Sequence, residues 1–392
     1  MEACKPILNT GLRGFTIASS RISDVDGDIG KIVYRGYLIQ DLAQKASFEE
    51  VVYLLLFESL PGKAELQAFK EQLAAQRQLE PELIAALKTR PKDALPMDIL
   101  QAGVALLAHH DPDTGDFTKA SATRMGTRLI ARFPSIMAAW DRIRNGKEPI
   151  APKPELSHAA NFLYMLSGKV PDEDVARFFD VCLTLHAEHT FNASTFAARE
   201  VASTRAHIYA ATAAAVGSLS GELHGGANVR VMEMLLKIGS PERVEAYVNE
   251  QLNAGKLIFG LGHAVYKVDD PRALILAPMS KIMGERTGQP QWYEISTDLE
   301  KKAKKIFKDR KGIEIFTNVD FYSASLYYSM GIPMDFFTPV FALARISGWV
   351  AHVIEEQFAG AAEKPVLYRP ESKYIGDYCG PDTCEFVDIE DR

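Results

Sequence analysis

The sequence predicts an all-α protein, and three observations favour this fold class. Apolar residues recur at spacings of three and four through most of the chain, as in SFEEVVYLLLFESL and ELQAFKEQLAAQRQL, which is typical of amphipathic helices. Prolines separate these segments, and strand-like alternation is rare. The chain has 392 residues, 47% of them hydrophobic, so it can bury a large core and form two domains.

Near the N-terminus, KIVYRGYLI is the best strand signal, and we expect a short hairpin or edge strand there. The preceding DVDGDIG has aspartates at alternate positions, like the opening of an EF-hand loop. That loop needs glycine at its sixth position and glutamate at its twelfth, where this chain has Ile29 and Arg35. We therefore predict a polar turn without calcium. Further on, Ser47 and Glu50 form a capping-box pattern at a helix start.

Two later helical segments have unusual composition. AHIYAATAAAVGSL is rich in alanine, whose small side chain lets helices approach closely, so we expect it to be deeply buried or packed against a second subunit. Residues 301–311 include seven Lys or Arg. Such a run is usually a solvated helix face, and phosphate binding is the alternative.

Composition excludes several classes of protein. A formal net charge of −7 argues against general nucleic-acid binding. The longest apolar run, VVYLLLF, is far shorter than the ~20 residues of a membrane span, and MEACKPILNT lacks the features of a signal peptide. Four scattered cysteines do not suggest a disulfide framework, and we do not predict a bond between Cys379 and Cys384. We expect a cytoplasmic protein.

Several familiar catalytic motifs are missing. The sequence has no GxGxxG before a helix, no P-loop and no GxSxG, so nucleotide hydrolysis and serine-esterase chemistry lose their usual support. His186 and His189 flank Glu188 in LHAEHTFNAS, but the zincin pattern HExxH is absent. These residues favour a polar pocket, and we predict no metal ligands.

Three polar residues stand out in apolar or glycine-rich surroundings: His224 in SGELHGGANVRVME, His263 in GLGHAVY and Asp320 in TNVDFYS. Glycines beside His224 let a substrate approach, and a helix N-terminus would keep the imidazole neutral, able to donate to a carbonyl. An aspartate in an apolar setting is a plausible base for a carbon acid. Each has a structural alternative, since His224 could cap a turn and Asp320 could be an N-cap.

Two arginines are candidates for binding an anionic substrate. Arg272 in VYKVDDPR and Arg345 in FALARISGW have the planar fork that suits carboxylates. Alternatively, an arginine in an apolar helix pairs with a buried acid.

The chain closely resembles the citrate synthase family, which includes the 2-methylcitrate synthases. The likeness extends from GLRGFTIASSRISDVDGDIGKIVYRGYLIQDLA through LHAEHTFNASTFAARE, LHGGANVRVMEML, GLGHAVYKVDDPRA and NVDFYSASLYYSMGIPMDFFTPVFALARISGW to RPESKYIG. It implies a helical homodimer. Each subunit would have a large domain, residues 1–225 and 336–392, and a small domain, residues 226–335, that closes over the active site.

The resemblance also implies roles. His224 would bind the thioester carbonyl of an acyl-CoA while Asp320 removes a proton from the adjacent carbon, and His263 would polarise the ketone of oxaloacetate. The oxaloacetate carboxylates would bind to His189, Arg272, Arg345 and, from the other subunit, Arg369. CoA would contact Leu257, Ile258, Gly260, Lys267 and Lys311.

Two positions depart from the family pattern. Ala264 stands where many bacterial relatives have arginine, and Thr317 stands where proline is common before NVD. The first removes one possible contact to CoA phosphate, and the second makes that loop less rigid. Neither removes a reacting group.

The resemblance therefore implies the activity of a citrate synthase, an acyltransferase of the tricarboxylic acid cycle that uses acetyl-CoA as substrate and needs no cofactor. A 2-methylcitrate synthase using propionyl-CoA, or an enzyme that accepts both, is the alternative because one methylene is worth only ~1 to 3 kcal/mol in an apolar pocket. A non-catalytic acyl-CoA or tricarboxylate sensor and a metal-dependent enzyme are the remaining hypotheses. We predict no nucleic-acid or membrane partner.

Overall fold

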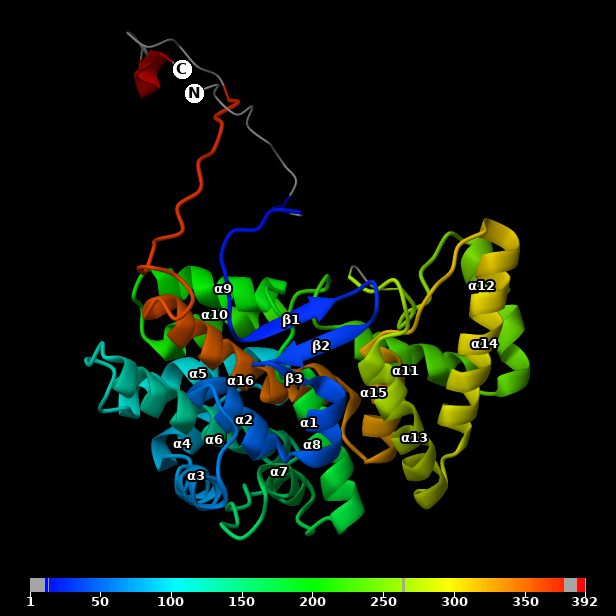
Figure 1. The fold of residues 1–392 in the computed structure, drawn as a ribbon, viewed down its shortest axis with the longest axis horizontal. Helices are drawn as coiled ribbons and strands as arrows, with labels where there is room; N and C mark the ends of the chain where they lie inside the picture. Colours follow the sequence, from blue (N-terminus) through cyan, green and yellow to red (C-terminus); the bar gives the residue numbers. More distant parts are fainter. Residues whose placement is uncertain (1–10, 13, 263–264, 377–385, 392) are drawn as a thin grey trace.

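The computed structural model describes residues 11–12, 14–262, 265–376 and 386–391. Helices form nearly all of the regular structure in these ranges, with one small sheet (Figure 1). The predicted all-α fold class is confirmed.

The sheet lies near the N-terminus and has three antiparallel strands in the order β1-β2-β3. They are β1 (Ser23–Asp26), β2 (Lys31–Tyr34) and β3 (Tyr37–Leu38). Asp26 pairs with Lys31 across the first turn, in which the Asp28 N–H donates to Asp26 Oδ1 at 3.0 Å. The predicted hairpin and polar turn are therefore confirmed. Tyr34 is fully buried and points its hydroxyl at the carbonyl of Glu188, 2.8 Å away, so the sheet anchors the segment beside His189.

Eleven of the described helices pack together as the larger part of the molecule (Figure 1). Ser47 and Glu50 form the predicted capping box at the start of α2, and prolines occupy the first position of α4 and α5, where no intrahelical N–H is needed. The helices are α1 (Ile39–Lys45), α2 (Phe48–Phe57), α3 (Lys63–Ala75), α4 (Pro81–Lys88), α5 (Pro96–Leu107), α6 (Lys119–Arg144), α7 (His158–Ser167), α8 (Glu173–His186), α9 (Ala193–Ser203), α10 (Ile208–Leu219) and α16 (Phe337–Gln357).

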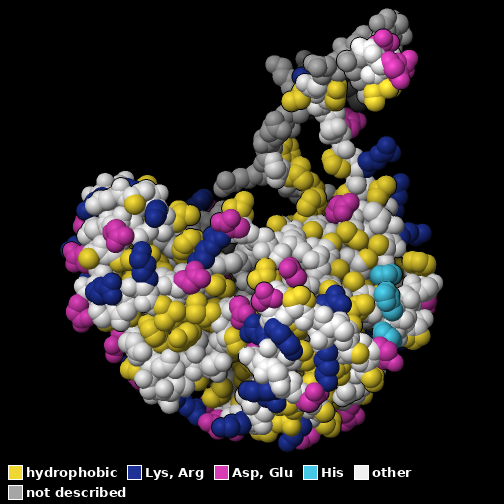
Figure 2. All heavy atoms as spheres, turned by 180° about the vertical axis from the view of Figure 1, so that it is seen from behind, with side chains coloured by type: hydrophobic (Ala, Val, Ile, Leu, Met, Phe, Trp, Pro, Cys, Tyr) yellow, Lys and Arg dark blue, Asp and Glu magenta, His cyan; other side chains and the backbone are white. Residues whose placement is uncertain are grey.

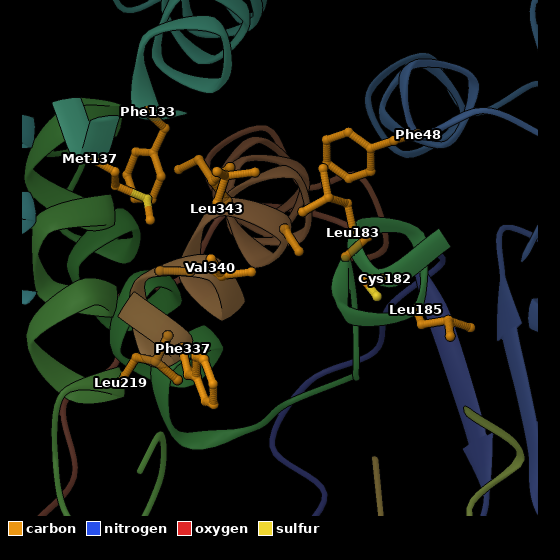
Figure 3. Packing of buried hydrophobic residues seen from close by; sticks show 14 of the residues in the cluster. Phe48, Phe133, Met137, Cys182, Leu183, Leu185, Leu219, Phe337, Val340 and Leu343 are labelled. Carbon is orange, nitrogen blue, oxygen red and sulfur yellow. The ribbon is translucent and has the colours of Figure 1, made fainter. Parts of the chain in front are cut away.

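Helix α16 runs through the middle of this core. Figure 3 shows its residues Phe337, Val340 and Leu343 between side chains of α6 and α10 on one side and of α2 and α8 on the other. Residues Met334–Gln357 are long and apolar enough to cross a membrane by length and composition, but 94% of an apolar 18-residue stretch within them is buried inside the protein. Burial on all sides identifies a central core helix.

The alanine-rich segment forms α10, which packs on α5, α9 and α16. Its residues Tyr209, Ala211, Ala215 and Val216 are fully buried. This agrees with the deep burial that its composition predicts.

Five helices lie beside this core as a second group (Figure 1). They are α11 (Ala227–Ile238), α12 (Val244–Asn253), α13 (Pro271–Arg286), α14 (Gln291–Lys311) and α15 (Val319–Ser329). Short 3-10 turns occur at Ala108–His110, Pro241–Arg243, Met334–Phe336 and Ile389–Asp391. The division into domains at residues 226 and 335 stays a prediction.

Candidate active site

His224 lies in the turn between α10 and α11, and its ring points to the start of a different helix, α9. The backbone N–H of Ser194, at the second position of α9, donates to His224 Nε2 at 3.2 Å, and the Ser194 hydroxyl lies 2.8 Å from the same nitrogen. A backbone N–H can only donate, so Nε2 is unprotonated and the proton of the neutral ring is on Nδ1. No described residue accepts a hydrogen bond from Nδ1, so this N–H is the available donor.

The surroundings of His224 keep its ring neutral. Burial and then the positive charge of Arg345 lower the pKa of His224 to about 4. The sequence suggested that the following helix, α11, would disfavour the imidazolium. Helix α11 does begin directly after the two glycines, at Ala227, but the helix N-terminus that contacts the ring is that of α9.

The packing of Gly225 explains why the first residue after His224 is a glycine. A Cβ at this position would lie 2.1 Å from the carbonyl oxygen of Leu219 and 2.8 Å from Thr338 Cγ2. The Gly225 carbonyl also accepts a hydrogen bond from the Thr338 hydroxyl at 2.9 Å. Gly226 has no atom within 4 Å of its added Cβ. The first glycine is thus required by the close packing of the turn against α10 and α16.

Asp320 occupies the first turn of α15. The side chain of Asn318 caps this helix by accepting the Asp320 N–H at 3.1 Å. Asp320 is therefore not the N-cap, and its carboxyl group does not cap the helix. Burial, opposed by the positive charges of Arg272 and Arg345, raises the pKa of Asp320 to about 6. A carboxyl with that pKa is a stronger base than an ordinary aspartate and is still mostly ionised at neutral pH.

The positive charge of Arg345 acts on both His224 and Asp320. It is 1% exposed in α16, and its Nε donates to the carbonyl of His186 at 2.8 Å. This is its one hydrogen bond within the described residues, so its terminal nitrogens remain for a ligand. Burial lowers the pKa of Arg345 to about 10, against the opposing charges of Glu188 and Asp320. The side chain is therefore a buried cation whose charge acts on both His224 and Asp320.

Arg272 is held by its neighbour Asp270. Arg272 Nε and Nη2 donate to the two Asp270 oxygens at 3.0 and 2.7 Å, and Asp270 caps α13 by accepting the Arg272 N–H. Both side chains are buried. Burial alone would lower the pKa of Arg272, but Asp270 outweighs it and raises this pKa above its ordinary value. The pair presents an oriented cation next to Arg345 and Asp320.

A second ion pair fixes the loop before Asp320. Both Asp269 oxygens accept from Lys304 Nζ, at 2.7 and 2.8 Å, and Asp269 Oδ1 also accepts from the Thr317 N–H and hydroxyl at 2.9 and 3.0 Å. Thr317 therefore forms a hydrogen bond that the more common proline could not form through its nitrogen. The threonine anchors this loop through both bonds, so the prediction that its departure from proline makes the loop less rigid is not supported.

His189 is buried and its Nε2 lies 2.8 Å from the Tyr266 hydroxyl. Tyr266 follows the segment of His263, and the Arg272 guanidinium lies 5.9 Å from the Tyr266 ring centre. His189, Tyr266 and Arg272 thus form one polar cluster. His263 and Ala264 lie outside the described residues, and so do Cys379 and Cys384.

The residues predicted to contact CoA differ in their exposure and in their partners. Gly260 has a φ of +80°, and a Cβ there would lie 2.6 Å from Phe321, whereas Leu257 is 77% exposed and Ile258 is buried. Lys267 forms an ion pair with Asp28 at 2.7 Å. Lys311 ends α14, so the basic run is helical as predicted, and its Lys304 is turned inward to Asp269.

Arg369 is exposed on the C-terminal segment that leaves the globular body after α16 (Figure 1). No hydrogen bond or ion pair connects it with the other described candidate residues. Its contribution to another subunit stays a prediction.

Sequence reasoning missed Ser194, Asp270 and Asp269 as partners of the site. The AspAspProArg string contained a usable signal, because an acid before proline is a common N-cap and can pair with the arginine that follows. Ser194 had no such signal, since it is thirty residues from His224. In the described ranges, no cluster of three or more His, Cys, Asp or Glu is arranged to hold a metal ion.

Comparisons with known proteins show the family of the chain. Residues 11–371 match the family described as "Citrate synthase, C-terminal domain". The chain is 44% identical to the citrate synthase of Synechocystis sp. over 95% of this chain and 92% of that protein. It is 37% identical to the 2-methylcitrate synthase of Mycobacterium tuberculosis, over 95% and 91%.

Solved structures of citrate synthases have the same fold as this chain. The citrate synthase of Pyrobaculum aerophilum superposes with a TM-score of 0.89 and 38% identity, covering 97% of this chain and 95% of that one. The citrate synthase of Thermoplasma acidophilum, in a ternary complex with carboxymethyl coenzyme A and oxaloacetate, has a TM-score of 0.88 and 31% identity, covering 97% and 98%.

The fold and the comparisons together define a helical acyltransferase, and its candidate site contains a neutral histidine and an aspartate of raised pKa. The chain belongs to the citrate synthase family. The resemblance noted in the sequence is confirmed.

Proposed function

We propose that this protein is a citrate synthase that condenses acetyl-CoA with oxaloacetate. Asp320 removes a proton from the methyl carbon, while His224 Nδ1–H donates to the thioester oxygen, where negative charge develops. The enol attacks the ketone of oxaloacetate, polarised by His263, and hydrolysis of the thioester releases citrate and CoA. The observation that carries this proposal is the pairing of a neutral imidazole donor with a carboxyl of raised pKa. Each group is expected to contribute ~10²-fold or more.

Oxaloacetate carries two carboxylates, and the buried cations Arg272 and Arg345 are suited to bind them together with His189. The Thermoplasma relative, solved with oxaloacetate and a CoA analogue, supports this choice of ligands. For CoA we propose Leu257, Ile258, Gly260, Lys267 and Lys311, as the family resemblance implies.

We further propose a homodimer in which Arg369 completes the oxaloacetate site of the other subunit. Its exposed position on a segment that extends from the body supports this (Figure 1). The exposed apolar side chains Phe15, Ile17 and Leu223 line the same hollow as Phe196, which packs against Tyr368, and they also suit a subunit contact. Mixing inactive Arg369→Ala and Asp320→Ala chains tests it: sites shared between subunits regain activity in mixed dimers, and sites within one chain do not.

The distribution of surface charges supports small-molecule substrates without a nucleic-acid partner. Figure 2 shows Lys and Arg side chains interspersed with Asp and Glu over the face seen from behind, without one continuous basic area on that face. We place the enzyme in the cytoplasm, and cell fractionation tests this.

Acetyl-CoA is the preferred substrate in this proposal because relatives named citrate synthase reach 44% identity and the 2-methylcitrate synthase 37%. A thiol-release assay with acetyl-CoA and propionyl-CoA, each with and without oxaloacetate, tests it. Faster turnover of acetyl-CoA, dependent on oxaloacetate, is expected. A large preference for propionyl-CoA in kcat/KM would instead identify a 2-methylcitrate synthase.

The sensor and metal-dependent hypotheses give different results. We expect Asp320→Ala to bind oxaloacetate and to lose condensation by orders of magnitude, which separates an enzyme from a binding protein. Full activity after exhaustive chelation is expected, and loss of activity on chelation would favour a metal-dependent enzyme.

A further inference from the structure

Helix α16 carries a stripe of polar contacts through the core beyond the active site. Arg345, Gly348 and His352 are spaced by three and four residues, so they share one helix face. Arg345 Nε donates to the His186 carbonyl at 2.8 Å, and the Gly348 N–H donates to the Ala187 carbonyl at 3.2 Å. His352 continues the series and contacts the side chain of Glu188 at 2.9 Å. The stripe therefore fixes the segment that ends at His189.

Glu188 is a fully buried carboxylate with one satisfied oxygen. Its Oε1 accepts hydrogen bonds from His352 and from the Ser23 hydroxyl, both at 2.9 Å. Its Oε2 has no partner among the described residues and packs against Gly348, where a Cβ would lie 2.2 Å away. The glycine leaves room for this carboxylate, and the hydrogen bonds to Oε1 decide where it points.

The proton of His352 is assigned by Arg199. Arg199 Nη1 lies 2.9 Å from His352 Nδ1, and a guanidinium can only donate, so Nδ1 is unprotonated. The ring proton is then on Nε2 and is donated to Glu188. Arg199 is itself fixed by Glu355 and Glu356, at 2.9 and 2.5 Å. His352, 0% exposed, thus has one orientation and one tautomer.

Glu188 and Arg345 are opposite charges in the same buried region, yet no hydrogen bond joins them. Burial alone would raise the pKa of Glu188, but contact with His352 and the charge of Arg345 outweigh it, so the pKa lies below its ordinary value. An ionised carboxylate released from His352 and Ser23 would be drawn to the open nitrogens of Arg345. It would then occupy the guanidinium in place of a ligand carboxylate.

We propose that His352, oriented by Arg199, is a positioning residue for the oxaloacetate site: it holds Glu188 near Arg345 as a counter-charge and keeps that carboxylate off the guanidinium. This rests on the proposed binding of oxaloacetate at Arg345. His352 need not touch substrate, and it acts through Glu188.

The test compares His352→Gln, His352→Asn and His352→Leu. A glutamine amide can present an N–H to Glu188 at the position of Nε2, whereas asparagine is too short to reach Glu188 and leucine has no donor. We expect the dissociation constant of oxaloacetate, measured by calorimetry, to rise about tenfold or more in the Asn and Leu variants and to stay within about threefold of wild type in the Gln variant. The KM for acetyl-CoA at saturating oxaloacetate should change little.

His158→Leu is the matched control. His158 is also a buried histidine, 1% exposed, but its ring nitrogens have no partner among the described residues, and it lies on α7 away from the site. It should leave oxaloacetate binding unchanged. Unchanged oxaloacetate affinity in folded His352→Asn, or equal weakening in His352→Gln, would overturn the proposal. Because binding is measured directly, a wild-type protein that binds oxaloacetate without turnover would refute the proposed function alone.

Discussion

The backbone amide of Ser194 donates to Nε2 of His224 at 3.2 Å, and this contact places the imidazole proton on Nδ1. The donor that faces a substrate is therefore the nitrogen nearer to the backbone. Asparagine can present an N–H at nearly that position, and glutamine presents one at the position of Nε2 instead.

We therefore expect His224→Asn to keep more condensation activity than His224→Gln. Loss of an oxyanion donor costs about 10²- to 10³-fold in kcat, so the Gln variant should fall by that factor. Steady-state thiol release at saturating substrates measures the difference. Equal activity of the two variants would show that Nδ1 is not the donor.

Activity should depend on pH through Asp320. Because the pKa of Asp320 is raised to about 6 and only the ionised carboxyl can act as base, log kcat/KM for acetyl-CoA should rise with pH up to about 6 and then level off. Protonation of His224, with a pKa of about 4, lies below this range. A profile that is flat from about pH 5 to 8 would argue against Asp320 as the base.

The same raised pKa has a stability consequence. A carboxyl whose folded pKa lies above its unfolded value stabilises the fold at low pH, and that stability is lost as pH rises through about 6. Asp320→Asn should therefore raise the free energy of unfolding at pH 8, by on the order of 1 to 3 kcal/mol, while abolishing activity. Denaturant unfolding at pH 5 and pH 8 measures this. A variant less stable than wild type at pH 8 contradicts it.

Asp270 orients Arg272 through two hydrogen bonds. Asp270→Asn removes the charge and should leave a buried guanidinium without its counter-ion, so we expect oxaloacetate affinity to fall by about tenfold or more. Asp172→Asn is the control, because its ion pair with Arg286 is exposed. Calorimetric titration with oxaloacetate compares the two, and equal affinities would refute the role of Asp270.

Gly225 and Gly226 offer a matched pair. Gly225→Ala forces a Cβ against the Leu219 carbonyl, so the turn carrying His224 must move, and we expect a loss of about 1 to 3 kcal/mol in stability together with a lower kcat. Gly226→Ala has open space and should remain close to wild type. Similar behaviour of both variants would mean that the packing of Gly225 does not position His224.

The helical fold class and the capping box at Ser47 could be predicted from the sequence, and the sequence also singled out His224 and Asp320 as candidate reactive side chains. These depend on local spacing, on short-range hydrogen bonding and on residue types in unusual surroundings, all of which a linear pattern contains. The structural alternative for Asp320 could not be excluded at that level, because Asn318 and Asp320 are both acceptable N-caps.

The electrostatic state of the site could not be predicted from the sequence, because it depends on tertiary contacts. The N-terminus of α9 contacts the His224 ring. The charge of Arg345 acts on both His224 and Asp320. Glu188 contacts His352, which lies 164 residues further along the chain. Burial and long-range partners set the pKa of a group and the position of its proton, and folding brings those partners together from segments that have no pattern in common.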